Sequence, residues 1–158
     1  MRLLLAAVGR AKPGPERDLF EHYRRRLSWP LDLKEVEEKR PLPTADRMAR
    51  EGDLLLAAVP SGWPLVVLDE RGKTLDSESL AKLLGDWRDH GRGGAAFLVG
   101  GADGHAPAVR QRAELVLSLG VMTWPHLLVR GMLAEQFYRA ECILANHPYH
   151  RGRAGLAD

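Results

Sequence analysis

LVGGADG at residues 98–104, LGVMTWPH at residues 119–126 and ANHPYHR at residues 145–151 are the segments that decide the fold of this chain. Each of the first two begins with an apolar run typical of a buried strand and then passes into glycine. Ligands of open α/β sheets bind beyond the carboxyl ends of the strands, where glycine lets the backbone approach them closely. We therefore predict that both glycine-bearing strand ends and the aromatic, basic tail belong to one ligand site.

Apolar runs alternate with amphipathic stretches along the rest of the 158 residues. The pattern predicts strands over residues 2–8, 31–37, 65–68, 95–99 and 115–119, with a connection at 69–73. It predicts helices over residues 16–27, 44–59 with Thr44 as N-cap, 77–90 beginning at Ser77 or Ser79, 107–114, and from Pro125 to about Asn146. Strands that alternate with helices indicate an α/β sandwich on a mostly parallel sheet, and the length suits one domain over residues 1–158.

Composition excludes several classes of protein. Cys142 is the only cysteine, so the chain has no intrachain disulfide and no cysteine-based zinc site. The apolar run at residues 3–8 is too short for a signal peptide, and no stretch approaches the roughly 20 apolar residues of a membrane span. We expect a cytoplasmic protein without a membrane partner.

The charge of the chain leaves the question of a nucleic-acid partner open. The net charge of +2 is too small to indicate one, but arginine greatly outnumbers lysine and residues 24–26 are three consecutive arginines. The planar guanidinium group suits phosphate binding and base stacking. A GC-rich genome, which favours arginine codons, explains the same bias.

The tail places His147 and His150 three residues apart, beside Tyr149 and Arg151. No other histidine or cysteine has the spacing of a metal ligand, so no metal site is expected. An aromatic residue flanked by histidine and arginine suits stacking on a base and holding phosphate, although a frayed surface tail has the same composition.

Other candidate catalytic groups are few. His105 and His126 are interpreted as structural or loop residues, and the aspartates show no paired-acid spacing. The absence of G-x-S-x-G and the place of Cys142 within a helix argue against a nucleophilic hydrolase. The GGADG segment matches neither the dinucleotide nor the Walker pattern, so it is also consistent with a plain turn.

The last helix carries apolar residues on nearly every face, whereas a surface helix needs only one apolar stripe. These residues are Leu127, Leu128, Met132, Leu133, Phe137, Tyr138, Ile143 and Leu144. Such a helix packs between two layers, of which the sheet is one. The second layer is either a partner subunit or another part of the same chain, and the sequence leaves both open.

Five segments together resemble one family: AAVGRAKPG, VVLDERGKTLDS, FLVGGADG, LSLGVMTWPHLLVRGMLAEQFYRA and NHPYHR. Over residues 1–151 the chain is similar to the RlmH family of bacterial 23S rRNA pseudouridine-N3 methyltransferases, in the SPOUT superfamily. The block from PHLLVR to NHPYHR is highly specific, whereas the glycine motifs are not. The resemblance implies a SPOUT-type sandwich with a C-terminal trefoil knot, which general rules of chain topology would have excluded.

The resemblance also implies that S-adenosylmethionine binds in the knot. By motif match, the cofactor contacts fall on Leu68, Gly100, Leu119, Gly120, Val121, Met122, Thr123 and Trp124. Apolar side chains and backbone groups at strand ends suit adenine and methionine, which need no strong charge from the protein.

The same resemblance implies a homodimer in which the tail of one subunit completes the site of the other. The implied substrate is a pseudouridine in the helix 69 loop of 23S rRNA, within the assembled 70S ribosome. Tyr149 and Arg151 match the tail positions associated with the target base, with His147 and His150 beside them. Arg151 would stabilise the anion formed when N3 loses its proton, and Tyr149 would stack on the base or hydrogen-bond to it. The sequence identifies no general base.

Two features depart from the family pattern. Ala102 and Asp103 stand where the family commonly has proline and glutamate, and residues 152–158 extend past the usual end near Arg151. We expect residues 152–158 to be a flexible extension that points away from the substrate. A catalytically silent ribosome-binding factor and a SPOUT methyltransferase of another RNA, such as tRNA, remain as alternatives.

Overall fold

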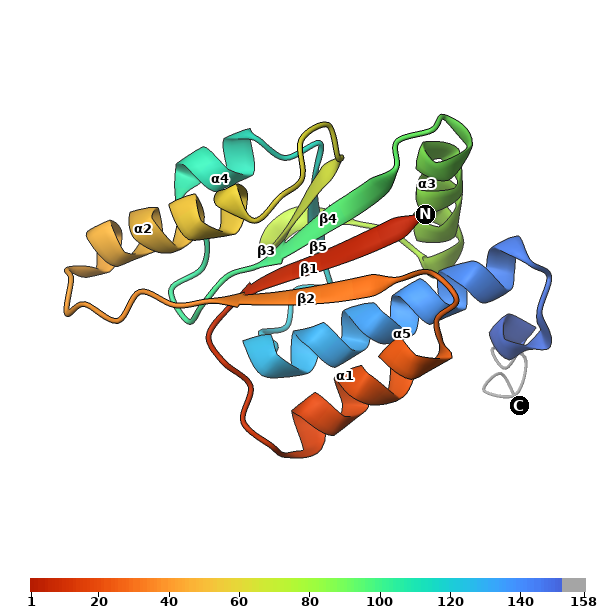
Figure 1. Cartoon of the computed structure of the whole chain (residues 1–158), viewed down its shortest axis with the longest axis horizontal. Helices are drawn as coiled ribbons and strands as arrows, with labels where there is room; N and C mark the ends of the chain where they lie inside the picture. The colour runs from red at the N-terminus through yellow and green to blue at the C-terminus, as the bar shows by residue number, and fades with distance from the viewer. Residues whose placement is uncertain (152–158) are drawn as a thin grey trace.

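The computed structural model describes residues 1–151, in which five strands and five helices alternate (Figure 1). The strands are β1 (Arg2–Val8), β2 (Leu31–Val36), β3 (Leu65–Thr74), β4 (Gly94–Val99) and β5 (Leu115–Ser118). The helices are α1 (Pro15–Arg26), α2 (Thr44–Ala57), α3 (Ser77–Asp89), α4 (Pro107–Gln111) and α5 (His126–Leu144). The extension expected over residues 152–158 lies outside the described residues.

The strands form one sheet in the order β2-β1-β4-β3-β5, and all four neighbouring pairs are parallel. The central strand β4 is buried along its whole length, because a parallel sheet is covered on both faces. The prediction of an α/β sandwich on a mostly parallel sheet is therefore confirmed. The trefoil knot stays a prediction from the family resemblance.

Two helical layers cover the sheet (Figure 1). Helices α1, α3 and α5 pack on one face, where the rings of Phe97 in β4 and Phe137 in α5 meet edge to face with centroids 4.7 Å apart. Helices α2 and α4 cover the other face, with Leu55 and Val109 in its core. No helix among residues 1–151 combines the length and apolar character that a membrane crossing needs.

Most boundaries lie within three residues of the sequence expectation. Pro43 precedes α2 and no side chain caps the helix, so Thr44 is the first helical residue rather than the N-cap. Helix α3 begins at Ser77, one of the two expected starts, and its N-cap is Asp76, whose carboxylate accepts a hydrogen bond of 2.7 Å from the backbone N–H of Ser79. Strand β3 also continues through the expected connection at 69–73: it leaves its pairing with β5 at Leu68 and resumes it at Lys73.

The all-round apolar character of α5 has its explanation within the chain. The helix lies between the sheet and α1, and both α1 and α3 pack against it. Gly131 permits the close crossing with α1, since a Cβ there would lie 2.7 Å from Leu19 Cδ2. Of the two interpretations left open by the sequence, the structure shows the central position within one chain. Leu127, Leu128 and Met132 nevertheless remain half-exposed.

Candidate functional site

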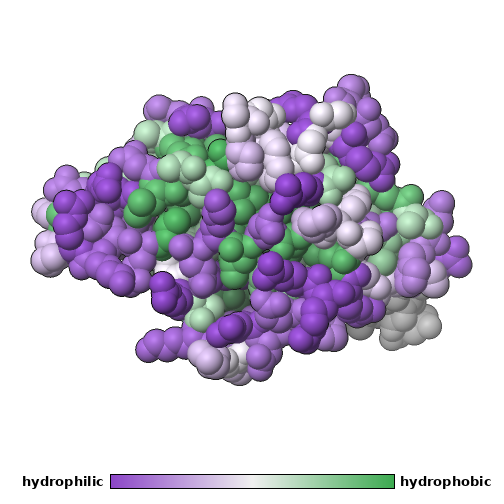
Figure 2. Space-filling model, viewed as in Figure 1, coloured by the Kyte–Doolittle hydropathy of each residue, from purple (hydrophilic) through white to green (hydrophobic). Residues whose placement is uncertain are grey.

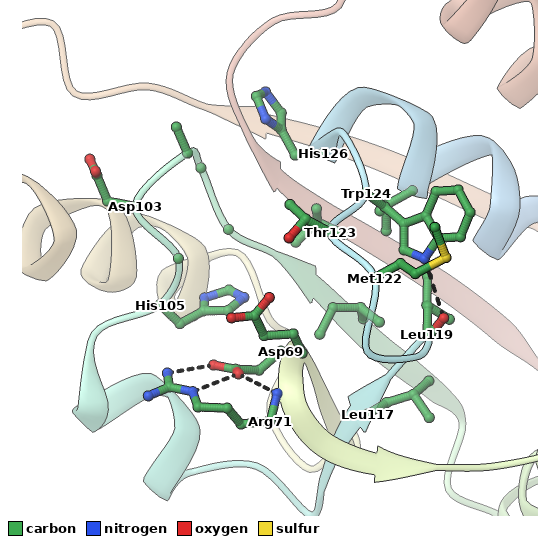
Figure 3. A pocket seen from close by; sticks show the side chains of 18 of the residues that line it. Asp69, Arg71, Asp103, His105, Leu117, Leu119, Met122, Thr123, Trp124 and His126 are labelled. Atoms are coloured by element: carbon green, nitrogen blue, oxygen red, sulfur yellow. Dashed lines mark hydrogen bonds and ion pairs between the residues drawn. The ribbon is translucent and has the colours of Figure 1, made fainter.

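A cavity of about 400 Å³ lies where β4 and β5 end and where β3 leaves its pairing with β5, beside the start of α5 (Figure 3). Its volume falls within the range of small-molecule sites. Seven of the eight predicted cofactor contacts line it, namely Leu68, Gly100, Leu119, Gly120, Met122, Thr123 and Trp124. Val121, the eighth, is not among the lining residues and is 95% exposed. The structure thus brings the ends of β4 and β5 and the middle of β3 together around one space.

The GGADG segment forms one wall of this cavity as a tight turn. Gly101 and Gly104 are joined by an isolated bridge, with a hydrogen bond of 3.0 Å from Gly104 N to Gly101 O. A Cβ on Gly100 would lie 3.1 Å from the carbonyl carbon of Gly104, so the closeness of the two backbones requires glycine. The segment is therefore both a turn and a wall of the site.

The loop between β5 and α5 forms the opposite wall. Gly120 has φ of 109°, a backbone conformation that side chains disfavour, and its N–H donates to Ser118 Oγ at 3.1 Å. The indole Nε1 of Trp124 donates to the Leu119 carbonyl at 3.3 Å and closes the loop. Met122 is 67% exposed at the rim, so an apolar ligand edge could be covered by this side chain.

Asp69 lies within β3, just after Leu68, where β3 leaves its pairing with β5, and Figure 3 shows Arg71 holding its carboxylate. Arg71 donates two side-chain hydrogen bonds to the carboxylate at 3.0 Å, and Arg110 adds a third at 3.4 Å. These bonds, chiefly those from Arg71, lower the pKa of Asp69 to about 2. The carboxylate stays ionised at neutral pH and is too weak a base to remove a proton from a substrate.

Two histidines line the cavity: His105, which is a buried loop residue as the sequence predicted, and His126, which begins α5. Burial lowers the pKa of His105, although the backbone of Leu98 and Leu68 opposes this shift. Burial, together with the positive charge of Arg130, also lowers the pKa of His126. Both imidazoles are therefore neutral at pH 7. His105 Nε2 is buried and has no hydrogen-bond partner among the described residues. The place of His105 directly after the glycine turn was the sequence signal that its side chain would lie at the cavity wall.

Arg130 fixes the start of α5 against the sheet, a role that the sequence did not suggest. Its side chain is only 2% exposed, and its Nη1 donates to Glu35 Oε2 at 2.7 Å. Its Nη2 donates to the carbonyls of Val8 at 3.1 Å and Gly9 at 2.8 Å. One side chain thus ties α5 to the carboxyl ends of β1 and β2.

Tyr149 lies outside the cavity, against α1 and α5. Its hydroxyl donates to Glu135 Oε1 at 3.0 Å and lies 3.4 Å from the Tyr23 hydroxyl. Burial is the largest of the causes that raise the pKa of Tyr149, so the phenol stays protonated at neutral pH. The guanidinium groups of Arg139 and Arg26 lie 4.9 Å and 5.3 Å from the centre of its ring.

Tyr149 lines a second, larger cavity, of about 1040 Å³, that shares Leu117, Leu119 and Gly120 with the first. The two cavities therefore adjoin at the end of β5. His147 lies apart from both, in a hollow beside Trp29, and its Nδ1 accepts a hydrogen bond from Tyr149 N at 3.2 Å.

Arg151 is exposed. Within one chain, the structure does not bring the three tail residues to the walls of the 400 Å³ cavity. Among residues 1–151, no group of three or more histidine, cysteine or carboxylate side chains is placed to hold a metal ion.

An all-parallel sheet with a cavity beside the carboxyl ends of β4 and β5 defines an open α/β protein, a class in which ligands bind at that edge of the sheet. The family model described as predicted SPOUT methyltransferase matches residues 1–150. A protein of Rhodospirillum centenum, named ribosomal RNA large subunit methyltransferase H, is 64% identical over 96% of this chain and 99% of its own. Proteins with the same name from Paramagnetospirillum magneticum and Rhodospirillum rubrum are 62% and 58% identical over the same shares.

The chain belongs to the SPOUT methyltransferases, in the RlmH family that these relatives represent. The resemblance on which the sequence analysis relied is therefore confirmed along nearly the whole chain.

Proposed function

We propose that this protein transfers a methyl group from S-adenosylmethionine to N3 of a pseudouridine in the helix 69 loop of 23S rRNA, within the 70S ribosome. The observation that carries the proposal is the 400 Å³ cavity, which is lined by seven of the eight positions matched to the family's cofactor contacts. The printed name of the relatives, ribosomal RNA large subunit methyltransferase H, supports the choice of RNA.

The residues of the cavity fit this cofactor. Leu68, Leu119 and Met122 provide apolar surface for an adenine ring, and the glycine turn that begins at Gly100 brings main chain close to the cavity. When bound, S-adenosylmethionine supplies a methyl group activated by a positively charged sulfur. Neutral imidazoles from His105 and His126 at the wall add no positive charge that would repel that sulfur.

The tail residues would act on the acceptor base. The imide N3–H must lose its proton, and the guanidinium of Arg151 would stabilise the negative charge that develops. Tyr149, protonated at neutral pH, would donate a hydrogen bond to the base or stack on it. His147 would orient the tail through the hydrogen bond that its Nδ1 accepts from Tyr149 N. We assign no general base.

A homodimer is part of the proposal, because the three tail residues do not line the 400 Å³ cavity of their own chain. A second copy would bring its tail to that cavity. Half-exposed Leu127, Leu128 and Met132 on α5, together with exposed Val121 and Met122, offer apolar surface for this contact.

The test is transfer of labelled methyl from S-adenosylmethionine to ribosomes that lack the modification, with isolated large subunits and tRNA in parallel. We expect label as N3-methylpseudouridine in large-subunit RNA. The Arg151→Ala variant should lose transfer while it still binds S-adenosylhomocysteine, whereas Arg112→Ala, a change at the C-cap of α4, should behave as the natural protein.

Label in tRNA would overturn the target but keep the reaction. A protein that binds S-adenosylhomocysteine but labels no RNA would instead be a silent ribosome-binding factor.

A further inference from the structure

A hollow of about 500 Å³ lies between α1, the edge strand β2 and the start of α5, and the reaction proposed above does not use it. Four arginines line it: Arg10 from the loop after β1, Arg17 and Arg24 from α1, and the buried Arg130 of α5. Hydrophilic side chains cover the α1 side of the molecule in Figure 2. The hollow is therefore a polar, cationic depression on the surface.

The carboxylates around the hollow leave part of this positive charge unpaired. Glu35 is held by Arg130 at 2.7 Å, and Glu21 pairs with Arg24 at 3.3 Å. Within residues 1–151, Arg10 and Arg17 make no ion pair, and both are exposed. Glu16 lines the hollow without an ion pair among these residues, and Glu35, although bound to Arg130, also lies within electrostatic range of Arg10. Two guanidinium groups thus face one surface depression with few internal partners.

The hollow adjoins the 400 Å³ cavity through the start of α5. Gly9 precedes Arg10, and a Cβ on Gly9 would lie 3.8 Å from Nε2 of His126, which lines that cavity. At the other end of α1, the guanidinium of Arg26 lies 4.4 Å from the centre of the Tyr138 ring. A helix of 12 residues spans roughly 18 Å, so arginines accompany α1 over a distance of several nucleotides.

We propose that this hollow binds a backbone phosphate of the RNA substrate, with Arg10 and Arg17 as its ligands. The identification of the partner as RNA rests on the proposed function. The planar guanidinium group binds a phosphate through two parallel hydrogen bonds, which fixes orientation as well as supplying charge. A phosphate held here would position the RNA relative to the cavity, because Arg130 ties α5 to the carbonyls of Val8 and Gly9, next to Arg10.

The experiment measures the affinity of large-subunit ribosomal RNA for the full chain across a series of salt concentrations. It compares the natural protein with Arg10→Ala, Arg17→Ala and the double variant. Arg112→Ala is the matched control, since Arg112 is exposed at the C-cap of α4, on the opposite face of the sheet, and makes no ion pair within residues 1–151.

We expect the double variant to bind RNA about tenfold more weakly at low salt and to reduce the slope of log affinity against log salt by about one. The control should change neither quantity. Affinity for S-adenosylhomocysteine and the melting temperature should be unchanged in every variant, since none of the three residues lines the 400 Å³ cavity.

Equal losses in the control and the double variant would overturn the inference, because they would reflect total charge alone. Unchanged RNA binding in the double variant would also overturn it, as would binding of vesicles rich in anionic lipid in preference to RNA. A natural protein that methylates no RNA would refute the proposed function. If the double variant then still lost RNA binding relative to the control, the phosphate site would stand without that function.

Discussion

Replacing Arg130 with methionine should destabilise the protein more than any other single loss of an ion pair described above. The substitution keeps most of the side-chain volume but removes hydrogen bonds to Glu35 Oε2 and to the carbonyls of Val8 and Gly9. Loss of one partner of a buried ion pair costs about 3–5 kcal/mol. Glu35 would keep its 2.6 Å hydrogen bond from Ala11 N, and its side chain is 28% exposed, so we expect about 3 kcal/mol.

The assay is urea unfolding at one fixed protein concentration, because association of subunits would otherwise change the apparent stability. A loss of about 3 kcal/mol corresponds to a fall of roughly 6–12 °C in melting temperature for a chain of this size. Arg130→Lys should lie between methionine and the natural residue, since lysine keeps the charge without the planar fork.

Arg88→Met is the matched control for this prediction. Arg88 pairs with Asp89 at 2.8 Å on the exposed surface of α3, and its loss should cost less than about 1 kcal/mol. If Arg130→Met costs no more than Arg88→Met, then the buried contacts of Arg130 do not stabilise the start of α5 as we argue.

Three further predictions concern the walls of the cavity. Asp69 has a pKa lowered to about 2, so its ionised carboxylate stabilises the fold above its unfolded pKa, and this stabilisation is lost as pH falls towards 2. Urea unfolding from pH 5 to pH 2 should therefore show a smaller loss of stability in Asp69→Asn than in the natural protein. His105 has a lowered pKa, so protonation opposes folding as pH falls below about 6.5, and His105→Leu should reduce this pH dependence in the same assay. The His105 variant should be at least as stable as the natural protein at pH 7, because it removes the unpartnered Nε2; a marked loss would show that this nitrogen has a partner. Gly100→Ala should weaken S-adenosylhomocysteine binding by at least tenfold in calorimetry, since its Cβ would press against the Gly104 backbone; unchanged binding would mean that the turn can move aside.

Much of the sheet was predictable because its strands are short apolar runs. β1 and β4 lie in the middle of a parallel sheet and are buried on both faces, so their sequences contain almost no polar residue. The continuation of β3 was not predictable in this way, since DERGK at residues 69–73 carries charges and glycine and lies where the pairing with β5 is interrupted. The local composition therefore reflects the break in pairing with β5 and not the strand that continues through it.

The cavity was predictable for a topological reason, and the arrangement of the tail was not. Parallel strands end at one edge of a sheet, so Gly100 and Gly120 had to approach one another once the strands were identified. The partners of Tyr149 are Glu135, 14 residues away, and Tyr23, 126 residues away. No periodicity in the sequence relates a tail residue to a helix at the other end of the chain.

Helix α5 connects the cavity, the sheet and the tail, and the positions of its residues along the helix explain how. His126 at the cavity and Arg130 on the ends of β1 and β2 are four residues apart, so they lie on the same side of the helix. Glu135, a little over one turn beyond Arg130, holds the hydroxyl of Tyr149. A rigid helix that touches the cavity, the sheet and the tail transmits any displacement at its start to the other two. The hydrogen bonds of this one buried side chain therefore set the distance between the cavity and the arginines of α1. Burying the charge costs stability, but its directional hydrogen bonds fix the position of α5 more closely than apolar contacts would.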